Sequence, residues 1–551
     1  MLRCARNDGI LEFIKYFLNR DLGTGINYDK EKKCDIILFI MPLTPILNYD
    51  DILKTPNSFN IIPLIHEISG DMDTPISIFS SFQREPCAFF FESTEGVGKW
   101  GRYSFICLNP LLTIRLYKDE LGVENFTGHK FGFKENINLK DSNEDVFAYI
   151  KKILSEFNIY KNNLSEEFIG GLFGYLGYEV GGLIEKLPPD KEDVTDIYDL
   201  FFMLPRDVVV YDGLNQVIKI VSYISRNNSD DERLRQEYDS AVKRINKITE
   251  IIEKRDFGFK KTEEIKKSNI EIIDETGFDE FKQKVLTAKE YILRGDIFQV
   301  QISRRKKIIN PPAPFLFYRA LRLVNPSPYM FYLKINDFVI TGSSPENLVK
   351  LSGGIIETRP IAGTIKRGEN PVEDEYLAEK LLDDPKERAE HIMLVDLSRN
   401  DIGRVSEKGS VKIDKLMYIE KYSHVQHIVT SVFSQIKEGN DAFDLVRASY
   451  PAGTVTGAPK VRAMEIINEL EKSKRGVYAG GIGYFGFLED GMCNKMEFCI
   501  TIRTALFKKN AAYIQAAGGI VHDSTPENEF AETENKLRHL ITAFNMTGRF
   551  N

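Results

Sequence analysis

Cysteine and histidine are scarce in this 551-residue sequence, and their arrangement excludes two kinds of site. The six cysteines include no C-x-x-C pair, and the seven histidines show no zinc-ligand spacing. Nothing therefore indicates a disulfide framework or a structural zinc site. We expect reduced thiols and a cytoplasmic protein.

Long hydrophobic runs and long basic runs are also absent. The most apolar short run, residues 36–43, is too short to span a bilayer. The N-terminus carries acids early and lacks a clean apolar core, which argues against a signal peptide. The net charge is −8, so neither nucleic acid nor an anionic membrane is an expected partner.

Phosphate-binding loops are missing as well. The glycine-rich segment 169–182, IGGLFGYLGYEVGG, lacks the lysine of a P-loop and the spacing of a dinucleotide fingerprint. It predicts closely packed backbone or turns instead.

What is present is a globular composition, 42% hydrophobic and 28% charged, long enough for two or more cores. Residues 1–55 do not join smoothly to the strand-like region after them, and we treat them as an N-terminal extension. Strand-like segments fill 56–225, and 226–275 predict a charged helix and a linker. Residues 276–545 mix helices and strands without regular βαβ alternation, which predicts an α+β fold.

Two Glu-x-x-Glu pairs are the most informative feature: Glu387 with Glu390, and Glu529 with Glu532. In a helix, a spacing of three places both carboxylates on one face. Two such pairs facing each other would form a cage of carboxylate oxygens. Such a cage suits a hard cation such as Mg²⁺.

A structural alternative exists for both pairs, because each comes after a helix-start signal. Asp384-Pro385 and Thr525-Pro526 each combine an N-cap residue with a proline at the first helical position. Acids near helix N-termini are common because the helix dipole favours them. Spacing alone favours this structural role over metal binding.

The surrounding segments reverse that preference. Six of them have mutually consistent content: GDIFQVQISRR (295–305), TGSSPENLVKL (341–351), TRPIAGTIKRG (358–368), the run 387–403, YPAGTVTGAPKVRAMEII (450–467) and QAAGGIVHDSTPENEFAETENK (515–536). In this order they resemble the chorismate-utilising enzymes, and within them the anthranilate synthase component I branch. The resemblance covers roughly residues 56–545.

The resemblance implies an anthranilate synthase-like α+β fold, with antiparallel sheets flanked by helices. It also implies an N-terminal regulatory region, 56–225, intertwined with a chorismate-binding catalytic domain, 276–545. The implied reaction joins chorismate and ammonia and releases anthranilate and pyruvate. This reaction depends on Mg²⁺, opens tryptophan biosynthesis and is inhibited by L-tryptophan.

The resemblance also assigns the substrate and metal sites. Glu390 and Glu532 would hold Mg²⁺, and Glu387 and Glu529 would hold its waters. The residues implied to bind chorismate are Gly363, Thr364, Tyr478, Arg503, Ala517, Gly518 and Gly519. Arg503, placed on the strand ITIRT, would take a substrate carboxylate through its planar fork.

Catalytic roles are implied for Glu346, His427, Thr454, Gln299 and Lys536. Glu346 is the general acid for loss of the ring hydroxyl; alternatively, Ser344-Pro345-Glu346 simply starts a helix. His427 serves the elimination, although a lone histidine is more often a core residue. Lys536 either binds substrate or pairs with Glu532 four residues earlier.

One loop departs from the family pattern. Residues 515–519 are Gln-Ala-Ala-Gly-Gly, where the family has Gln-Ala-Gly-Ala-Gly. If Ala517 needed positive φ, the change would cost energy.

Two positions separate the relatives. Water-using isochorismate and salicylate synthases have a lysine where this chain has Gln299, and an amide cannot activate water. Aminodeoxychorismate synthases attack the ring with a lysine where this chain has Ala362. Ammonia attack to give anthranilate is the remaining interpretation. Aminodeoxychorismate synthase component I and a non-catalytic regulatory homologue are the alternatives.

The resemblance implies two partners. The sequence has no G-x-C-x-G glutaminase segment, so a separate glutamine amidotransferase subunit, anthranilate synthase component II, would supply ammonia. The feedback site for L-tryptophan would comprise Ser93, Pro328, Tyr329 and Met330. Ordinary strand packing is the alternative there.

Overall fold

The computed structural model describes residues 47–93, 102–128, 132–142, 145–161, 170–188, 191–226, 231–254, 270–422 and 425–550. Most of the extension expected at 1–55 and of the linker expected at 257–275 lies outside these ranges. Pro45–Asn551 forms one compact unit.

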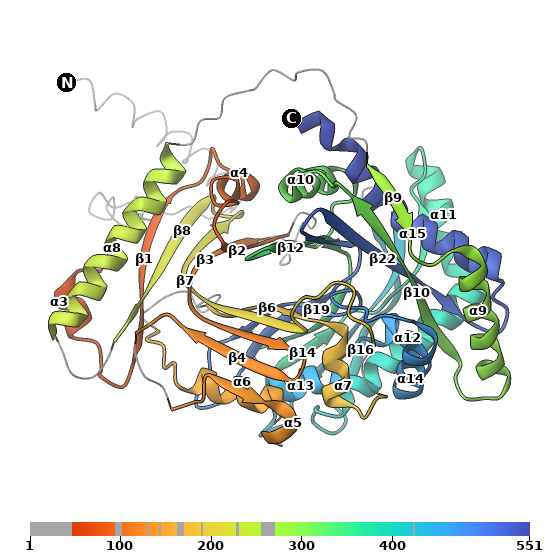
Figure 1. Ribbon diagram of the computed structural model, residues 1–551, viewed down its shortest axis with the longest axis horizontal. Helices are drawn as coiled ribbons and strands as arrows, with labels where there is room; N and C mark the ends of the chain where they lie inside the picture. Colours follow the sequence, from red (N-terminus) through yellow and green to blue (C-terminus); the bar gives the residue numbers. More distant parts are fainter. Residues whose placement is uncertain are drawn as a thin grey trace, which may run out of the picture. The chain divides into compact units, whose positions relative to one another are not determined.

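Antiparallel pairing joins the described strands into one continuous hydrogen-bonded network, which we describe as two sheets that share β3 and β7 (Figure 1). The strands of the first sheet, in spatial order, are β9 (Glu271–Asp274), β10 (Gln299–Ile309), β22 (Ala511–Ile520), β21 (Thr504–Lys508), β12 (Phe338–Ser344), β11 (Tyr329–Ile335), β2 (Cys87–Glu92), β3 (Tyr103–Tyr117), β7 (Leu200–Asp212), β8 (Val217–Ser225) and β1 (Ile61–Ser69). The short β18 (Gly457–Ala458) pairs with the start of β10.

The second sheet runs β5 (Asn136–Asn138), β4 (Glu120–Asn125), β3, β7, β6 (Gly171–Leu176), β19 (Gly481–Gly486), β20 (Lys495–Ile500), β13 (Asn347–Ser352), β14 (Ile355–Thr358) and β17 (Val425–Gln435). β15 (Ile361–Lys366) and β16 (Lys412–Lys421) also pair with β17.

The long strands β3 and β7 belong to both sheets. Their register shifts between Pro110 and Leu112, directly after Asn109, whose φ is +51°. This bulge bends the pair, so the first half of β3 meets β2 while its second half meets β4. The sequence GRYSFICLNPLLTIRLY, which could be taken for two strands, therefore forms one bent strand from Tyr103 onward.

Segments from the two halves of the sequence pair directly, which confirms the intertwined α+β fold. β2 lies against β11, and β6 lies against β19. Gly174 and Gly483 face each other across the second contact, and a Cβ on either would meet a neighbouring backbone oxygen at 1.9 Å. The glycine-rich segment does pack closely where the structure describes it.

Helices cover the sheets (Figure 1). The described α-helices are α3 (Tyr49–Leu53), α4 (Pro75–Ser80), α5 (Leu139–Ser142), α6 (Val146–Ser155), α7 (Gly181–Ile184), α8 (Asp231–Glu253), α9 (Phe278–Leu293), α10 (Pro314–Val324), α11 (Pro371–Asp383), α12 (Pro385–Gly403), α13 (Ala442–Ser449), α14 (Lys460–Leu470) and α15 (Pro526–Met546). Short 3₁₀ helices are η2 (Tyr178–Val180), η3 (Gly453–Val455) and η4 (Thr547–Phe550). α8 confirms the charged helix and packs on β8, whereas α15 packs on β22 and α10.

Two apolar clusters stabilise this arrangement. One joins residues of both sheets, including Phe173, Phe202 and Phe498. The other lies beneath the helices and includes Phe317 and Phe544, whose ring centroids are 4.2 Å apart.

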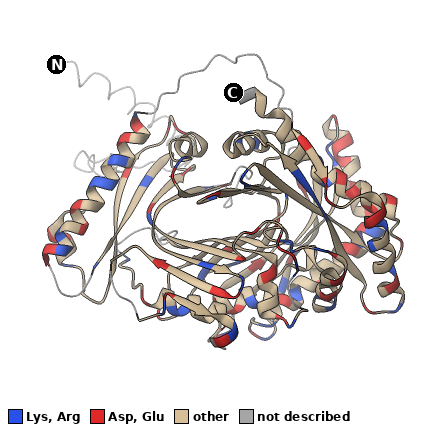
Figure 2. Cartoon of the chain, viewed as in Figure 1, with Lys and Arg blue, Asp and Glu red and all other residues tan. Residues whose placement is uncertain are grey.

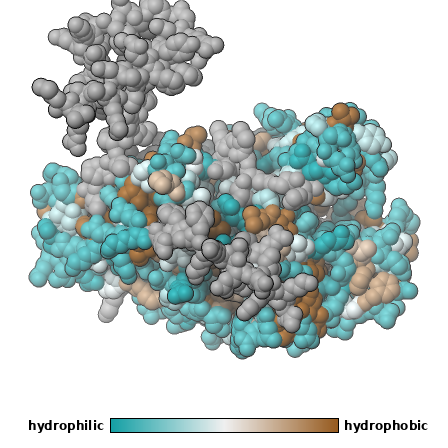
Figure 3. All heavy atoms as spheres, turned by 90° about the horizontal axis from the view of Figure 1, so that it is seen from above, coloured by the Kyte–Doolittle hydropathy of each residue, from teal (hydrophilic) through white to brown (hydrophobic). Residues whose placement is uncertain are grey.

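Among the described residues, no helix is long and apolar enough to cross a membrane. The face seen in Figure 3 is largely hydrophilic, with scattered hydrophobic patches.

Candidate functional site

The predicted site residues come from strand ends, turns and two helices. Both predicted helix starts are confirmed: Asp384 caps α12 by accepting from two backbone amides, and Thr525 caps α15. The α11, α12 and α15 region also carries many of the acidic residues in Figure 2. α12 therefore presents Glu387 and Glu390, and α15 presents Glu529 and Glu532.

Glu346 lies in the turn between β12 and β13, so the expected alternative of a helix start here is wrong. Its backbone carbonyl accepts from the Ile500 amide across the sheet, which holds the chain extended. The side chain is 7% exposed, and burial raises the pKa of Glu346 to about 8. The Thr454 hydroxyl, the Ile361 amide and the charges of Arg503 and Lys536 counteract part of this rise.

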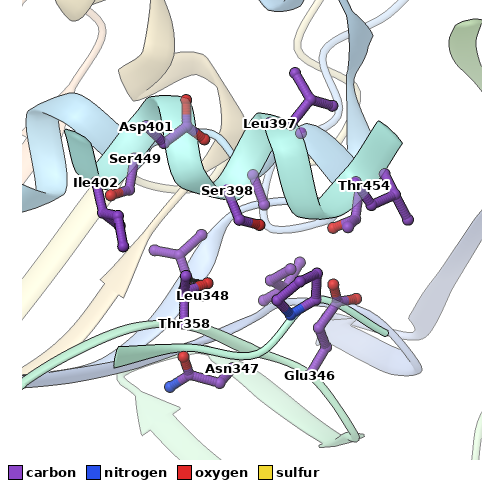
Figure 4. A pocket seen from close by; sticks show the side chains of 15 residues that line it. Glu346, Asn347, Leu348, Thr358, Leu397, Ser398, Asp401, Ile402, Ser449 and Thr454 are labelled. Carbon is purple, nitrogen blue, oxygen red and sulfur yellow. Dashed lines mark hydrogen bonds between the residues drawn. The ribbon is translucent and has the colours of Figure 1, made fainter. Parts of the chain in front are cut away.

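Thr454 lies on η3 and points toward Glu346 across one end of a cavity of about 20 Å³ (Figure 4). The hydroxyl lowers the pKa of Glu346. Its Oγ1 nevertheless has no hydrogen-bond partner of standard geometry among the described residues. The catalytic role implied for Thr454 stays a prediction.

His427 is a buried residue of β17. One of its ring nitrogens is hydrogen-bonded, and the other has no partner among the described residues. Its Nδ1 lies 3.0 Å from the Gly363 carbonyl and 3.0 Å from the Thr364 hydroxyl. Since a carbonyl can only accept, Nδ1 carries the hydrogen. Nε2 is buried and lacks a partner among the described residues. Burial and the Arg503 charge lower the pKa of His427 to about 4, so the ring is a neutral acceptor at Nε2 near pH 7.

The backbone conformation of Gly363 brings β15 into contact with His427. Its φ is +62°, and the register with β17 shifts between Ala362 and Thr364. The resulting bulge turns the Gly363 carbonyl onto the ring of His427. A Cβ at Gly363 would lie 3.1 Å from Glu387, so this glycine also leaves room for the carboxylate.

Arg503 lies in the turn between β20 and β21 and not on a strand, contrary to the sequence-based expectation. Its φ of +50° ends the strand geometry at this residue. Its side chain donates to Asn325 Oδ1 at 3.4 Å and forms no ion pair with a described carboxylate. Burial lowers the pKa of Arg503, and the Glu346 and Tyr422 charges counteract part of that shift. A guanidinium without an anionic partner is prepared to bind one.

The carboxylates of α12 and α15 are electrostatically coupled, because Glu532 acts on both Glu387 and Glu529. Burial and the Glu390 charge raise the pKa of Glu387, with a smaller contribution from Glu532. Burial also raises the pKa of Glu529, and one of its oxygens has no described partner. A Cβ at Gly518 would lie 2.9 Å from this carboxylate, so the glycine accommodates it.

The described residues contain no group of three or more His, Cys, Asp or Glu close enough to hold a metal by themselves. The expected four-carboxylate cage is therefore not preformed. Mutually destabilised carboxylates still fit a divalent cation that keeps several water ligands, as Mg²⁺ does. These carboxylates would therefore bind the ion weakly until a bound ligand completes its coordination.

Gln299 and Lys536 contact the predicted metal residues. Gln299 is 1% exposed and donates from Nε2 to Glu390 at 3.1 Å, while its Oε1 has no described partner. Lys536 pairs with Glu532 at 2.7 Å and donates to the Ala517 carbonyl at 2.9 Å. The ion-pair alternative for Lys536 is thus present, and its contact with substrate stays a prediction.

The loop 515–519 is part of β22, opposite β10. Ala517 pairs with Ser303 and is absent from the residues with positive φ, so its replacement of glycine causes no backbone strain. Beyond Ile514, β22 has a strand partner on one side alone within the described chain. Alternate backbone groups therefore face away from β10. The Ala517 amide is close enough to influence the Tyr478 hydroxyl, whose pKa burial raises.

The predicted inhibitor residues also meet. Ser93 lies directly after β2, and Met330 on the neighbouring β11 pairs with Glu92. The buried Ser93 Oγ has no partner among the described residues. Tyr329 donates to Glu497 at 3.0 Å and accepts from Asn347, the residue after Glu346. The candidate tryptophan site is therefore linked to the candidate acid, Glu346, through the hydrogen bond between Tyr329 and Asn347.

Several residues at the site could not be identified from the sequence. Asn325 contacts Arg503, and Tyr422 packs edge-on against His427 at 5.5 Å. Both line a second pocket of about 10 Å³ together with Arg503 and His427. Asn325 lies three residues before Pro328, which the sequence places at the inhibitor site, and no local pattern indicates a role for Tyr422. His424, adjacent in sequence to this group, lies outside the described residues.

Comparison with known proteins agrees with this geometry. A family model described as chorismate binding enzyme matches residues 98–542. Anthranilate synthase component 1 of Acetivibrio thermocellus is 43% identical over 506 residues, covering 91% of this chain and 98% of the relative. That of Aquifex aeolicus is 42% identical over 498 residues, covering 90% of this chain and 97% of the relative.

Solved structures agree as well. Anthranilate synthase component I from Streptococcus pneumoniae superposes with a TM-score of 0.68 at 32% identity, covering 86% of this chain and 98% of that one. The menaquinone-specific isochorismate synthase of Escherichia coli has a TM-score of 0.62 at 18% identity, covering 90% and 97%, which shows a shared fold.

Proposed function

This chain belongs to the chorismate-binding enzyme family, among relatives named anthranilate synthase component 1, and from that premise we propose its reaction. It joins ammonia to chorismate and eliminates pyruvate, giving anthranilate, the first step of tryptophan biosynthesis. The observation that carries the proposal is Arg503, which is half-buried and has no ion-pair partner among the described residues. It lines one pocket with the buried His427, and its charge acts on the buried Glu346.

Arg503 supports the substrate class. Chorismate carries two carboxylates, and the chain is acidic as a whole, so a local cation must bind them. A substrate carboxylate would supply the guanidinium with its missing partner through two parallel hydrogen bonds. Tyr478 and the outward backbone groups of 517–519 add neutral donors beside it.

Glu346 supports the loss of the ring hydroxyl. With its pKa near 8, the carboxyl is mostly protonated at neutral pH and can donate to the leaving oxygen. His427 can accept at Nε2, since Gly363 holds its other nitrogen as the donor. Burial and hydrogen bonding therefore make Glu346 the proton donor and His427 the proton acceptor.

Gln299 and Ala362 support ammonia as the nucleophile. Gln299 is a neutral amide fixed on Glu390, so it cannot take a proton from water. Ala362 is a buried strand residue without a nucleophilic atom, which leaves no covalent route through that position. Ammonia needs no such base because its neutral form is already nucleophilic.

Mg²⁺ fits between the α12 and α15 carboxylates. Glu390 and Glu532 would hold it, and Glu387 and Glu529 would hold its waters. When bound, it neutralises a substrate carboxylate and orients the ring. Lys536, now paired with Glu532, would then be released toward the substrate or toward Ala517.

Ammonia would come from a glutamine amidotransferase subunit, since the sequence has no G-x-C-x-G segment. We expect the purified chain to form anthranilate from chorismate, Mg²⁺ and an ammonium salt. Glutamine should support the reaction after addition of the second subunit and not before. Anthranilate fluorescence and product chromatography measure both. Aminodeoxychorismate as the main product would overturn the proposal in favour of that relative.

L-tryptophan would bind between Ser93 and the segment 328–330. The unpartnered Ser93 hydroxyl offers a hydrogen bond to the amino acid's polar end. Met330 and Tyr329 offer apolar surface for an indole. Inhibition then requires that tryptophan favour a conformation with the contacts to Asn347 or Arg503 displaced.

Ser93→Leu should relieve inhibition by tryptophan while leaving the uninhibited rate nearly unchanged. Loss of one hydrogen bond together with a steric clash predicts at least about a tenfold rise in the inhibitory concentration. Rates measured across a tryptophan titration test this. Ser222→Ala, a buried serine on β8, is the control and should retain full inhibition. Equal inhibition of Ser93→Leu and wild type would remove Ser93 from the site.

A further inference from the structure

One edge of β10 has a gap in its strand pairing close to the candidate site. On this edge, β18 pairs with Gln299 and Val300, and β9 pairs with residues 306–309. Between these two partners, the Gln301 carbonyl and the Ser303 amide have no strand beside them within the described chain. Backbone groups buried in this way need hydrogen bonds from another part of the molecule.

Glu471 and Arg475, four residues apart, supply those hydrogen bonds. Glu471 accepts from the Ser303 amide at 2.8 Å, and Arg475 donates to the Gln301 carbonyl at 2.6 Å. The two side chains are 6% and 3% exposed and join each other through bonds of 2.7 and 2.9 Å. Burial opposes ionisation of both groups, but their mutual attraction outweighs it, so the pKa of Glu471 is lowered and that of Arg475 is raised. This ion pair takes the place of a strand along β10.

Arg475 also holds two other segments of the candidate site. It donates to the Val455 carbonyl at 2.8 Å, directly after Thr454 on η3. Its guanidinium lies 5.8 Å from the ring centroid of Tyr478, three residues further along the chain. The Arg475 amide donates to Glu179 at 2.7 Å, which fixes the start of the turn that carries Tyr478. One arginine therefore contacts three segments, each of which carries a predicted site residue.

Gln299 depends on the position of β10. Gln299 and Gln301 lie two residues apart on the strand and so share one face. A Cβ at Gly519 would lie 2.6 Å from Nε2 of Gln299 and 2.9 Å from Nε2 of Gln301. Gln299 also donates to Glu390 at 3.1 Å. The backbone of β10 therefore determines where the Gln299 amide meets Glu390.

We propose that the Glu471–Arg475 ion pair positions the candidate site by holding β10, η3 and the turn before Tyr478 in one arrangement. Both are positioning residues, which act through Gln299, Thr454 and Tyr478 without contacting chorismate. An arginine suits this role because its planar fork binds a carboxylate and two carbonyls at once. The inference rests on the proposed function, which assigns those three residues to the site.

The double variant Glu471→Gln/Arg475→Met separates positioning from stability. An amide at position 471 still accepts from Ser303, and removing both charges leaves no buried charge unpaired. Its melting temperature should therefore exceed that of the single variant Arg475→Met. Its activity should not recover with stability, because the Val455 and Gln301 carbonyls still lack their donor. We expect KM for chorismate to rise about tenfold and kcat/KM to fall about a hundredfold.

Arg475→Lys tests the same point without removing the ion pair. An ammonium group can pair with Glu471, but it cannot bind both backbone carbonyls as well. This variant should show the same rise in KM, and it decides the question if the double variant fails to fold. KM is the informative constant, because loss of folded protein lowers the measured kcat and leaves KM unchanged.

Arg226→Met is the matched control. Arg226 is a buried arginine that donates to backbone carbonyls of residues 52–56, on and after α3 (Figure 1). Its loss should lower the melting temperature and leave KM for chorismate at the wild-type value.

An unchanged KM in the double variant and in Arg475→Lys would overturn the proposal, whatever happens to kcat. Absence of anthranilate from the wild type would instead overturn the proposed function. In that case, calorimetric titration with chorismate and Mg²⁺ still tests the positioning role. The Kd should weaken about tenfold in both variants and stay unchanged in Arg226→Met, and a wild-type Kd in both variants would refute the role.

Discussion

Glu346→Gln should lower kcat by about 10² to 10⁴-fold, because an amide cannot donate the proton that the leaving hydroxyl needs. The substitution preserves the size of the side chain and the contact with Thr454, so KM for chorismate should change little. Steady-state anthranilate formation with saturating ammonium salt measures both constants. A kcat within twofold of wild type would remove Glu346 from the chemistry.

The pH dependence gives this prediction a second readout. An acid catalyst acts while protonated, so the wild-type rate at fixed free ammonia should fall as pH rises through about 8. The residual rate of Glu346→Gln should lack this decline. Glu357→Gln is the control, because burial raises the pKa of Glu357 to about 7 on β14, outside both pockets. It should keep the wild-type profile.

Stability should depend on the same residue. The folded-state pKa of Glu346 lies above its unfolded value of about 4.5, so the folded state binds the proton more tightly. Its contribution is therefore fully favourable below the unfolded pKa and is lost as pH rises through about 8. As pH rises between these two values, the melting temperature of Glu346→Gln should increase relative to that of the wild type.

Glu390→Gln and Glu532→Gln should each abolish most Mg²⁺-dependent activity. Either change removes one negative charge from the carboxylates that would bind Mg²⁺. Electrostatic contributions of this kind are typically worth about 3 kcal/mol, or more than a hundredfold in rate. The concentration of Mg²⁺ needed for half-maximal rate should rise. Excess chelator should silence the wild type.

A matched control lies on the same helix. Glu527 is exposed in the first turn of α15, and Glu527→Gln should keep the wild-type Mg²⁺ dependence. Because the described residues hold no preformed metal cage, Mg²⁺ alone should shift the melting temperature little, and Mg²⁺ with chorismate should shift it more. Full activity of the wild type in chelator would refute the metal assignment.

Much of the fold was predictable because its signals are local. Asp384 and Thr525 cap their helices as their sequence context indicates. α8 lies in the range predicted to hold a charged helix, and β2, β7 and β8 lie in the strand-like range 56–225. A turn was harder to foresee: Ser344-Pro345-Glu346 carries a helix-start signal, yet β12 and β13 pair with β21 and β20 and hold it extended. Sheet pairing overrode local preference there.

By itself, the sequence determined which residues are available: two Glu-x-x-Glu pairs, one arginine after ITI, and neutral residues at 299 and 362. The tertiary structure alone decided their chemical states. Burial raises the pKa of Glu346 and so favours its neutral form, and the Gly363 carbonyl selects the tautomer of His427. Arg503 has no ion-pair partner among the described residues. These states depend on desolvation and on neighbours distant in sequence, which local residue patterns do not encode.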